Sequence, residues 1–130
     1  MDIYTNPIIV ADDDVRHLSN LLDALANKFR IEENKISFRM RGDDLVDAVL
    51  KGNYGVIITD DWMQDPEHTG RKSAKKIRDA GITTPIFLYS SNVFKSEEDW
   101  KPYGVTQVFR KGREDLEKLL TAVEEVYKTG

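Results

Sequence analysis

Short runs of apolar residues alternate along the chain with longer segments in which apolar residues recur every three or four positions. The short runs predict buried strands, and the longer segments predict amphipathic helices. The predicted strands are residues 7–11, 36–40, 56–59, 85–89 and 106–109. The predicted helices are residues 12–30, 43–50, 71–80, 93–101 and 114–127, of which the fourth is weak and ends at Pro102.

Three of these helices have a well-defined apolar face that we expect to pack on the core. In the helix at 12–30 this face consists of Val15, Leu18, Leu22, Leu25 and Phe29. In the helix at 43–50 it consists of Leu45, Val46, Val49 and Leu50. In the helix at 114–127 it consists of Leu116, Leu119, Leu120, Val123 and Val126.

The succession of five strand–helix pairs indicates the fold class. It is typical of an α/β domain, in which helices cover both faces of a parallel sheet. Right-handed crossovers then predict a doubly wound, five-stranded, flavodoxin-like (βα)5 sheet. Residues 36–40 alternate apolar and polar side chains, which is typical of an edge strand, so we expect the strand order 2-1-3-4-5.

Length and composition restrict the possibilities further. The 130 residues suit one domain, and we expect a single domain over residues 1–130. The absence of cysteine excludes disulfides and thiolate metal sites, and the net charge of -4 argues against direct nucleic-acid binding. No run approaches the roughly 18 apolar residues of a membrane span, and residues 1–9 do not resemble a signal peptide. We therefore expect a cytoplasmic protein without a membrane partner.

Acidic, hydroxyl and basic side chains follow four of the five expected strands, at the point where each strand ends. They are Asp12, Asp13 and Asp14 after the first strand, Asp60 and Asp61 after the third, Ser90 and Ser91 after the fourth, and Arg110 and Lys111 after the fifth. The carboxyl ends of parallel strands meet at one edge of the sheet, where such sheets bind ligands. These residues should therefore converge.

This combination of side chains fits phosphoryl transfer. Carboxylates that lie within a few ångströms repel one another, and Mg2+, which prefers oxygen ligands, removes that repulsion. A carboxylate can then act as a nucleophile toward phosphorus and form an aspartyl phosphate. Lys111 and Ser90 can stabilise the oxygens of the phosphoryl group.

Each of these residues also has a structural interpretation. An aspartate that follows a strand often caps the next helix, and we expect one of Asp12, Asp13 and Asp14 to do so. Asp12 and Asp14 also form the D-x-D string of haloacid dehalogenase-like phosphatases, but the companion motifs of those enzymes are not evident. The two histidines, His17 and His68, are expected to be surface residues.

The sequence resembles the receiver domains of two-component response regulators, including the single-domain chemotaxis regulator. The resemblance covers residues 7–127 and rests on the strings IIVADDD, YGVIITDDWM, TPIFLYSS and GVTQVFRKG. It implies a signalling domain that catalyses only its own phosphorylation and dephosphorylation. Its partners would be a sensor histidine kinase or phosphotransfer protein and an unidentified downstream protein.

The resemblance also implies roles for individual residues. In the family, an acidic pair after the first strand holds Mg2+, and this pair corresponds to Asp12 and Asp13. The phosphoacceptor closes the third strand, which corresponds to Asp60, and Asp60 also contributes to the metal site. The backbone carbonyl two residues beyond the acceptor, that of Trp62, would complete the metal ligands.

Two further residues would contact the phosphoryl group, namely Ser90 at the end of the fourth strand and Lys111 at the end of the fifth. Asp61 stays an alternative acceptor, because D-W-M is itself a familiar string of the family with the acceptor as its aspartate. The ungapped match of YGVIITD favours Asp60. Strand alternation adds that Asp60 and Asp61 cannot both face the site equally.

Four features depart from the family pattern. The loop at 60–70 is longer than usual, and its proline, Pro66, is displaced. Gly112 stands where the family has a cis-linked proline, and Val108 stands where it often has a switching tyrosine or phenylalanine. The fourth helix, around SEEDWKPYG, is short and irregular. The last three features lie on the face that receivers use for partner contact, so a phosphorylation-independent pseudo-receiver is the alternative function.

Overall fold

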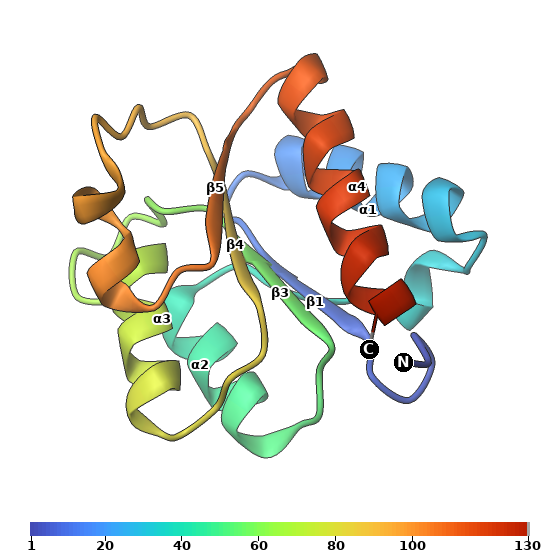
Figure 1. Cartoon of the computed structure of the whole chain (residues 1–130), viewed down its shortest axis with the longest axis horizontal. Helices are drawn as coiled ribbons and strands as arrows, with labels where there is room; N and C mark the ends of the chain where they lie inside the picture. The colour runs from blue at the N-terminus through green and yellow to red at the C-terminus, as the bar shows by residue number, and fades with distance from the viewer. Residues whose placement is uncertain (130) are drawn as a thin grey trace.

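The computed structural model describes residues 1–129, which form a five-stranded parallel sheet with helices on both faces (Figure 1). The strands are β1 (Ile8–Ala11), β2 (Ser37–Arg39), β3 (Val56–Thr59), β4 (Ile86–Ser90) and β5 (Gln107–Arg110). The α-helices are α1 (Val15–Phe29), α2 (Gly42–Lys51), α3 (Gly70–Asp79) and α4 (Arg113–Thr129), and a 3₁₀ turn, η1 (Glu33–Lys35), precedes β2. The strand order is β2-β1-β3-β4-β5, so the predicted fold class and order are confirmed.

The alternation of side chains along the strands divides the core into two clusters. Ile8 and Val10 of β1 face one side of the sheet and belong to the cluster beneath α1 and α4. Ile9 and Ala11 face the other side and belong to the cluster beneath α2 and α3. Figure 1 shows these two layers of helices on either side of the strands. No helix within residues 1–129 combines the length and the apolar character that crossing a membrane requires.

The predicted apolar faces of the first two helices are confirmed apart from two residues. Val15 is 62% exposed and Leu50 is 51% exposed, so the prediction that they face the core is wrong. Val15 is the first residue of α1, which begins beyond the end of the strands. Leu50 lies five residues after the buried Leu45, a spacing that turns it to another face of α2.

The helix predicted at 93–101 is also wrong. The chain there forms two 3₁₀ turns, η2 (Glu97–Asp99) and η3 (Lys101–Tyr103). The Asp99 carboxylate accepts the backbone N–H groups of Lys95 (2.9 Å) and Ser96 (3.3 Å), which holds the first turn as a separate capped unit. Pro102 lies within the second turn and lacks the N–H that a continuing helix needs. The segment from 93 to 105 therefore crosses the surface without a regular helix.

Candidate metal centre at the carboxyl edge of the sheet

The register of the strands brings four of their ends together. Ala11 of β1 pairs with Thr59 of β3, so that Asp12 and Asp60, which follow them, leave the sheet side by side. The N–H of Asp60 donates to the carbonyl of Ala11 (2.9 Å). On the other side, the N–H of Lys111 donates to the carbonyl of Ser90 (2.9 Å). The predicted convergence of these strand ends is thus observed.

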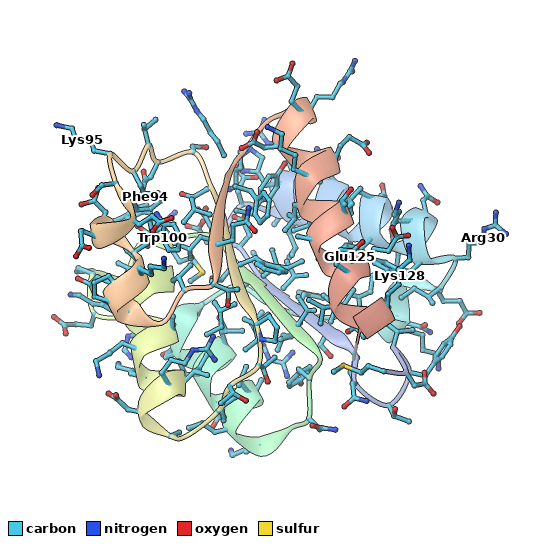
Figure 2. All side chains as sticks on the ribbon, viewed as in Figure 1. Arg30, Phe94, Lys95, Trp100, Glu125 and Lys128 are labelled. Atoms are coloured by element: carbon cyan, nitrogen blue, oxygen red, sulfur yellow. The ribbon has the colours of Figure 1, made fainter. Side chains whose placement is uncertain are left out.

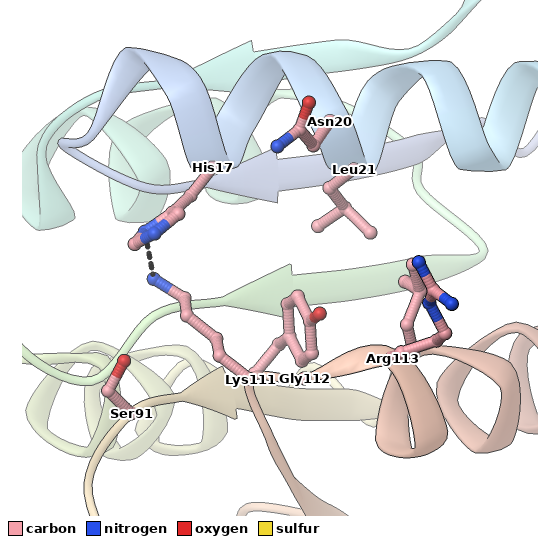
Figure 3. A pocket seen from close by; sticks show the side chains of 9 residues that line it. His17, Asn20, Leu21, Ser91, Lys111, Gly112 and Arg113 are labelled. Atoms are coloured by element: carbon pink, nitrogen blue, oxygen red, sulfur yellow. Dashed lines mark hydrogen bonds between the residues drawn. The ribbon is translucent and has the colours of Figure 1, made fainter.

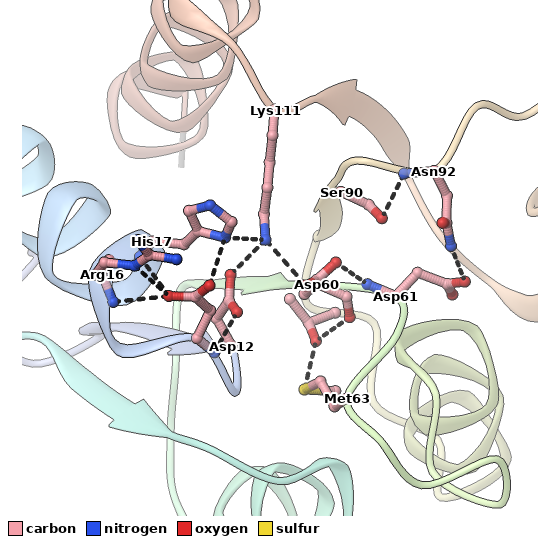
Figure 4. Close-up of polar contacts among 11 residues, drawn as sticks. Asp12, Arg16, His17, Asp60, Asp61, Met63, Ser90, Asn92 and Lys111 are labelled. Atoms are coloured by element: carbon pink, nitrogen blue, oxygen red, sulfur yellow. Dashed lines mark hydrogen bonds and ion pairs between the residues drawn. The ribbon is translucent and has the colours of Figure 1, made fainter.

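Three carboxylates and one ammonium group form the centre of this edge. Figure 4 shows Lys111 between two of these carboxylates, those of Asp12 and Asp60. Asp12, Asp13 and Asp60 each direct an oxygen into a group whose atoms all lie within 4.8 Å of one another. Lys111 Nζ donates to Asp12 Oδ2 (2.8 Å) and to Asp60 Oδ2 (2.9 Å). Within residues 1–129, Asp13 is the member of this cluster whose carboxylate has no hydrogen bond or ion pair. One cation therefore faces three anions.

Burial and charge shift two ionisation equilibria in this cluster. Burial raises the pKa of Asp60 above its ordinary value, and the charge of Asp12 adds to this rise, while Lys111 only partly opposes it. Burial by itself would lower the pKa of Lys111. The hydrogen bonds and charges of Asp12 and Asp60 outweigh it and raise that pKa. The ammonium form is thus stabilised between the two carboxylates.

The donor set fits a small divalent cation. All three acidic side chains offer carboxylate oxygens, which are the hard ligands that Mg2+ prefers. Asp12 is buried (3% exposed), whereas Asp13 and Asp60 are half-buried, so the cluster is open to solvent on one side. The carbonyl of Trp62 as a further ligand stays a prediction.

A shallow cavity of about 240 Å³ lies over the cluster. Its lining includes Asp60, Ser90, Lys111 and Trp62, whose side chain is 51% exposed. The oxygen of Ser90 accepts the backbone N–H of Asn92 (3.1 Å), which closes a tight turn after β4. The hydroxyl of Ser90 also interacts with the carboxylate of Asp60 and opposes the rise of its pKa, so Ser90 faces the candidate acceptor.

Asp61 is buried (2% exposed) and is not among the residues that line this cavity. Arg71, at the start of α3, pairs with both of its oxygens, through Nε to Oδ1 (3.0 Å) and Nη2 to Oδ2 (3.1 Å). Asn92 donates to Oδ2 from its side chain (3.1 Å). The sequence analysis did not identify Arg71 and Asn92 as partners of Asp61. A buried carboxylate needs a cationic partner, and this requirement was the signal that could have pointed to Arg71.

Asp14 is the helix cap that was expected among the first three aspartates. Its Oδ1 accepts the N–H groups of Arg16 (2.9 Å) and His17 (3.4 Å) at the start of α1. The hydrogen bond from Arg16 lowers the pKa of Asp14. Asp14 is therefore engaged in α1, unlike Asp13 beside it.

The histidines lie on different sides of the edge. His17 is a surface residue, as expected, but its Nδ1 is 3.0 Å from Lys111 Nζ. It also lines a second cavity, of about 470 Å³, between the first turns of α1 and the start of α4 (Figure 3). His68 is half-buried in the long loop, where its Nδ1 lies 2.8 Å from Asp65 Oδ2.

No protein-family model and no curated protein matches the sequence. Comparison of the structure with solved structures does find relatives. The receiver domain of a Francisella response regulator is 25% identical, with a TM-score of 0.70, 94% of this chain covered and 96% of the other. A two-component response regulator from Clostridium difficile is 21% identical, with a TM-score of 0.74 and coverages of 93% and 94%. The chemotaxis response regulator CheY4 of Vibrio cholerae is 24% identical, with a TM-score of 0.68 and coverages of 89% and 96%.

These neighbours agree on one class of protein. Over about 94% of its length, the chain has the fold of the response regulator receiver domains, as the sequence resemblance predicted.

Proposed function

We propose that the chain is a phosphoacceptor receiver that takes a phosphoryl group from a phosphohistidine onto Asp60 in a Mg2+-dependent reaction. The observation that carries this proposal is the cluster of Asp12, Asp13 and Asp60, whose oxygens lie within 4.8 Å, with Lys111 bonded to two of them. The donor would be a sensor histidine kinase or a phosphotransfer protein. Phosphorylation of Asp60 would switch a surface that binds a downstream protein.

The chemistry follows from the positions of the side chains. A carboxylate oxygen of Asp60 forms a bond to phosphorus while the P–N bond of the phosphohistidine breaks, and the electron pair of that bond leaves with the imidazole nitrogen. Lys111 and the hydroxyl of Ser90 exchange their contacts with the Asp60 carboxylate for contacts with two phosphoryl oxygens. Mg2+, held by Asp12, Asp13 and Asp60, would neutralise the charge of the carboxylates and of the phosphoryl oxygens.

The surroundings of the two neighbouring aspartates favour Asp60 as the acceptor. Asp60 borders the cavity and contacts Lys111. Asp61 is buried, and both of its oxygens are engaged by the guanidinium of Arg71. A carboxylate that is already satisfied and shielded from solvent is a poor nucleophile for an incoming phosphoryl donor.

Intact mass spectrometry after incubation with Mg2+ and acetyl phosphate tests the proposal. The wild type is expected to gain the mass of one phosphoryl group, and EDTA should prevent this. Asp60→Asn should not be labelled, whereas Asp61→Asn, which keeps the shape of its side chain, should be. Labelling of Asp60→Asn together with its loss in Asp61→Asn would move the acceptor to Asp61.

A phosphorylation-independent pseudo-receiver is the second candidate. The observation in its favour is the segment from 93 to 105, where two 3₁₀ turns replace the helix expected there. Such a protein would bind its partner through the same fold without a phosphorylated state. Absence of labelling by acetyl phosphate and by phosphoramidate, in folded wild-type protein with Mg2+, would favour this candidate.

A further inference from the structure

Asp61 and Arg71 form an ion pair beside the candidate site, in which the carboxylate is buried and the guanidinium is partly exposed. The Asp61 side chain is 3% exposed and accepts four hydrogen bonds. Two come from the guanidinium of Arg71, one from its backbone N–H (3.2 Å) and one from the side chain of Asn92. A two-point pair of this kind fixes the orientation of both groups, which a single contact would not do.

The opposite side of the Arg71 guanidinium holds the segment that replaces the fourth helix. Its Cζ lies 5.1 Å from the ring centre of Phe94 and 5.7 Å from that of Tyr103. Its Nη1 donates to the backbone carbonyl of Asp99 (3.1 Å). Phe94 and Trp100 gather in this region in Figure 2. Arg71 thus joins a buried carboxylate to residues 94–103, which are far from it along the chain.

The same ion pair is directly connected to the candidate acceptor. The backbone N–H of Asp61 donates to Asp60 Oδ1 (2.7 Å). Asn92, which shares Asp61 Oδ2 with Arg71, also donates its own N–H to the oxygen of Ser90 (3.1 Å). A shift of Asp60 or of Ser90 therefore acts on the group of atoms that holds Arg71.

We propose that Arg71 is a positioning residue that transmits the phosphorylation state of Asp60 to the surface formed by residues 94–103. This inference rests on the proposed function. Phosphorylation replaces the single negative charge of the Asp60 carboxylate by the roughly 1.5–2 negative charges of a phosphoryl group, and Ser90 turns toward it. Asn92 moves with Ser90 and loosens its hydrogen bond to Asp61. Arg71 then holds Asp61 without Asn92, and its position between Phe94 and Tyr103 changes.

Trp100 is a suitable reporter, because it is half-buried and packs against the core cluster beneath α2 and α3. Trp62→Phe removes the tryptophan beside the candidate site, so that the emission reports on residues 94–103. Acetyl phosphate with Mg2+ should shift the Trp100 emission of this reference protein. Intact mass, measured on the same sample, gives the extent of phosphorylation.

Arg71→Lys in that reference protein should lose most of the Trp100 shift while it is phosphorylated to the same extent. Lysine keeps the charge but has neither the planar fork nor the stacking surface of arginine. Arg78→Lys is the matched control. Arg78 also lies on α3 and holds the end of the same segment, through Nε to the carbonyl of Gly104 (3.0 Å). Its other hydrogen bonds within residues 1–129 go to the carbonyls of Ile82 and Thr84 and not to the loop at 60–70.

Asp61→Asn tests the same link from its other end and serves if Arg71→Lys does not fold. It should also lose the shift, because asparagine cannot accept both arms of the guanidinium. The inference is overturned if phosphorylated reference protein shows no Trp100 shift, if Arg71→Lys and Asp61→Asn keep it, or if Arg78→Lys loses it equally. Failure of phosphorylation in every protein, seen by mass before any fluorescence is read, would instead overturn the proposed function and the inference with it.

Discussion

Asp13→Asn should stabilise the metal-free protein. Asp13 contributes a negative charge to the cluster and, within residues 1–129, takes part in no hydrogen bond or ion pair. The substitution therefore removes repulsion without removing a stabilising contact. Asp60→Asn is a less clean test, because it also removes one of the two carboxylates that Lys111 contacts.

The size of the effect can be worked from the separations in the cluster. Two unit charges 4.8 Å apart interact with about 3.5 kcal/mol at an effective dielectric constant of 20. Asp13 is half exposed to solvent, and Lys111 offsets part of the charge of Asp12 and Asp60, so the net gain should be about 1–2 kcal/mol. For a chain of this length, that gain corresponds to a rise in melting temperature of roughly 3–8 °C.

Thermal melts in EDTA and in millimolar Mg2+ measure the effect. In EDTA, Asp13→Asn should melt above the wild type. Magnesium at ten times its dissociation constant should stabilise the wild type by about 1.4 kcal/mol. It should stabilise Asp13→Asn much less, because one ligand has lost its charge. The difference between the two proteins should therefore shrink or reverse when the metal is added.

Asp14→Ala is the matched control, since its carboxylate caps α1. Loss of the cap should lower the melting temperature in both buffers by a similar amount. The reasoning is refuted if Asp13→Asn behaves like Asp14→Ala and Mg2+ changes the melting temperature of neither variant nor of the wild type. Asp13 would then be a structural residue, and the cluster would not be a metal site.

Two other substitutions test separate parts of the structure. Lys111→Met should raise Mg2+ affinity several-fold, followed by Trp62 fluorescence, because the metal no longer competes with an ammonium group for Asp12 and Asp60. A loss of affinity as large as that of Asp13→Ala would contradict this division of roles. Tyr127→Phe should cost about 1 kcal/mol in urea unfolding at neutral pH, because the Tyr127 hydroxyl donates to the carbonyl of Asn6 (2.6 Å). Burial raises the pKa of Tyr127, so the folded state holds the phenol proton more tightly than the unfolded chain. The stabilisation of the folded state by this difference in pKa is complete below the ordinary tyrosine pKa of about 10 and is lost as the pH rises above it. If the unfolding free energies of wild type and Tyr127→Phe changed in parallel with pH, this role of Tyr127 would be refuted.

The repeating pattern of the sequence was enough to predict the fold. The strands β1, β3 and β4 are runs of mostly apolar residues, and the long helices have apolar residues at a helical spacing. This local pattern agrees with a sheet that helices cover on both faces. The same pattern indicated where strands end, and therefore that Asp12, Asp60, Ser90 and Lys111 would meet at one edge. It failed at residues 93–101, where polar residues, a capping aspartate and a proline favour short turns over a helix.

The tertiary structure decided which neighbours each of these side chains contacts. Lys111 bonds to Asp12 across 99 positions of sequence, and Asp61 turns to Arg71 while Asp60 turns to the cavity. From the local sequence, Asp60 and Asp61 are two adjacent aspartates with the same side-chain chemistry. Both lie just beyond the end of β3, and their environments differ because Asp60 meets Lys111, which follows β5, whereas Asp61 meets Arg71 at the start of α3. Only folding brings these partners there. Sequence by itself therefore determined the candidate residues, and long-range packing decided which of them share a site.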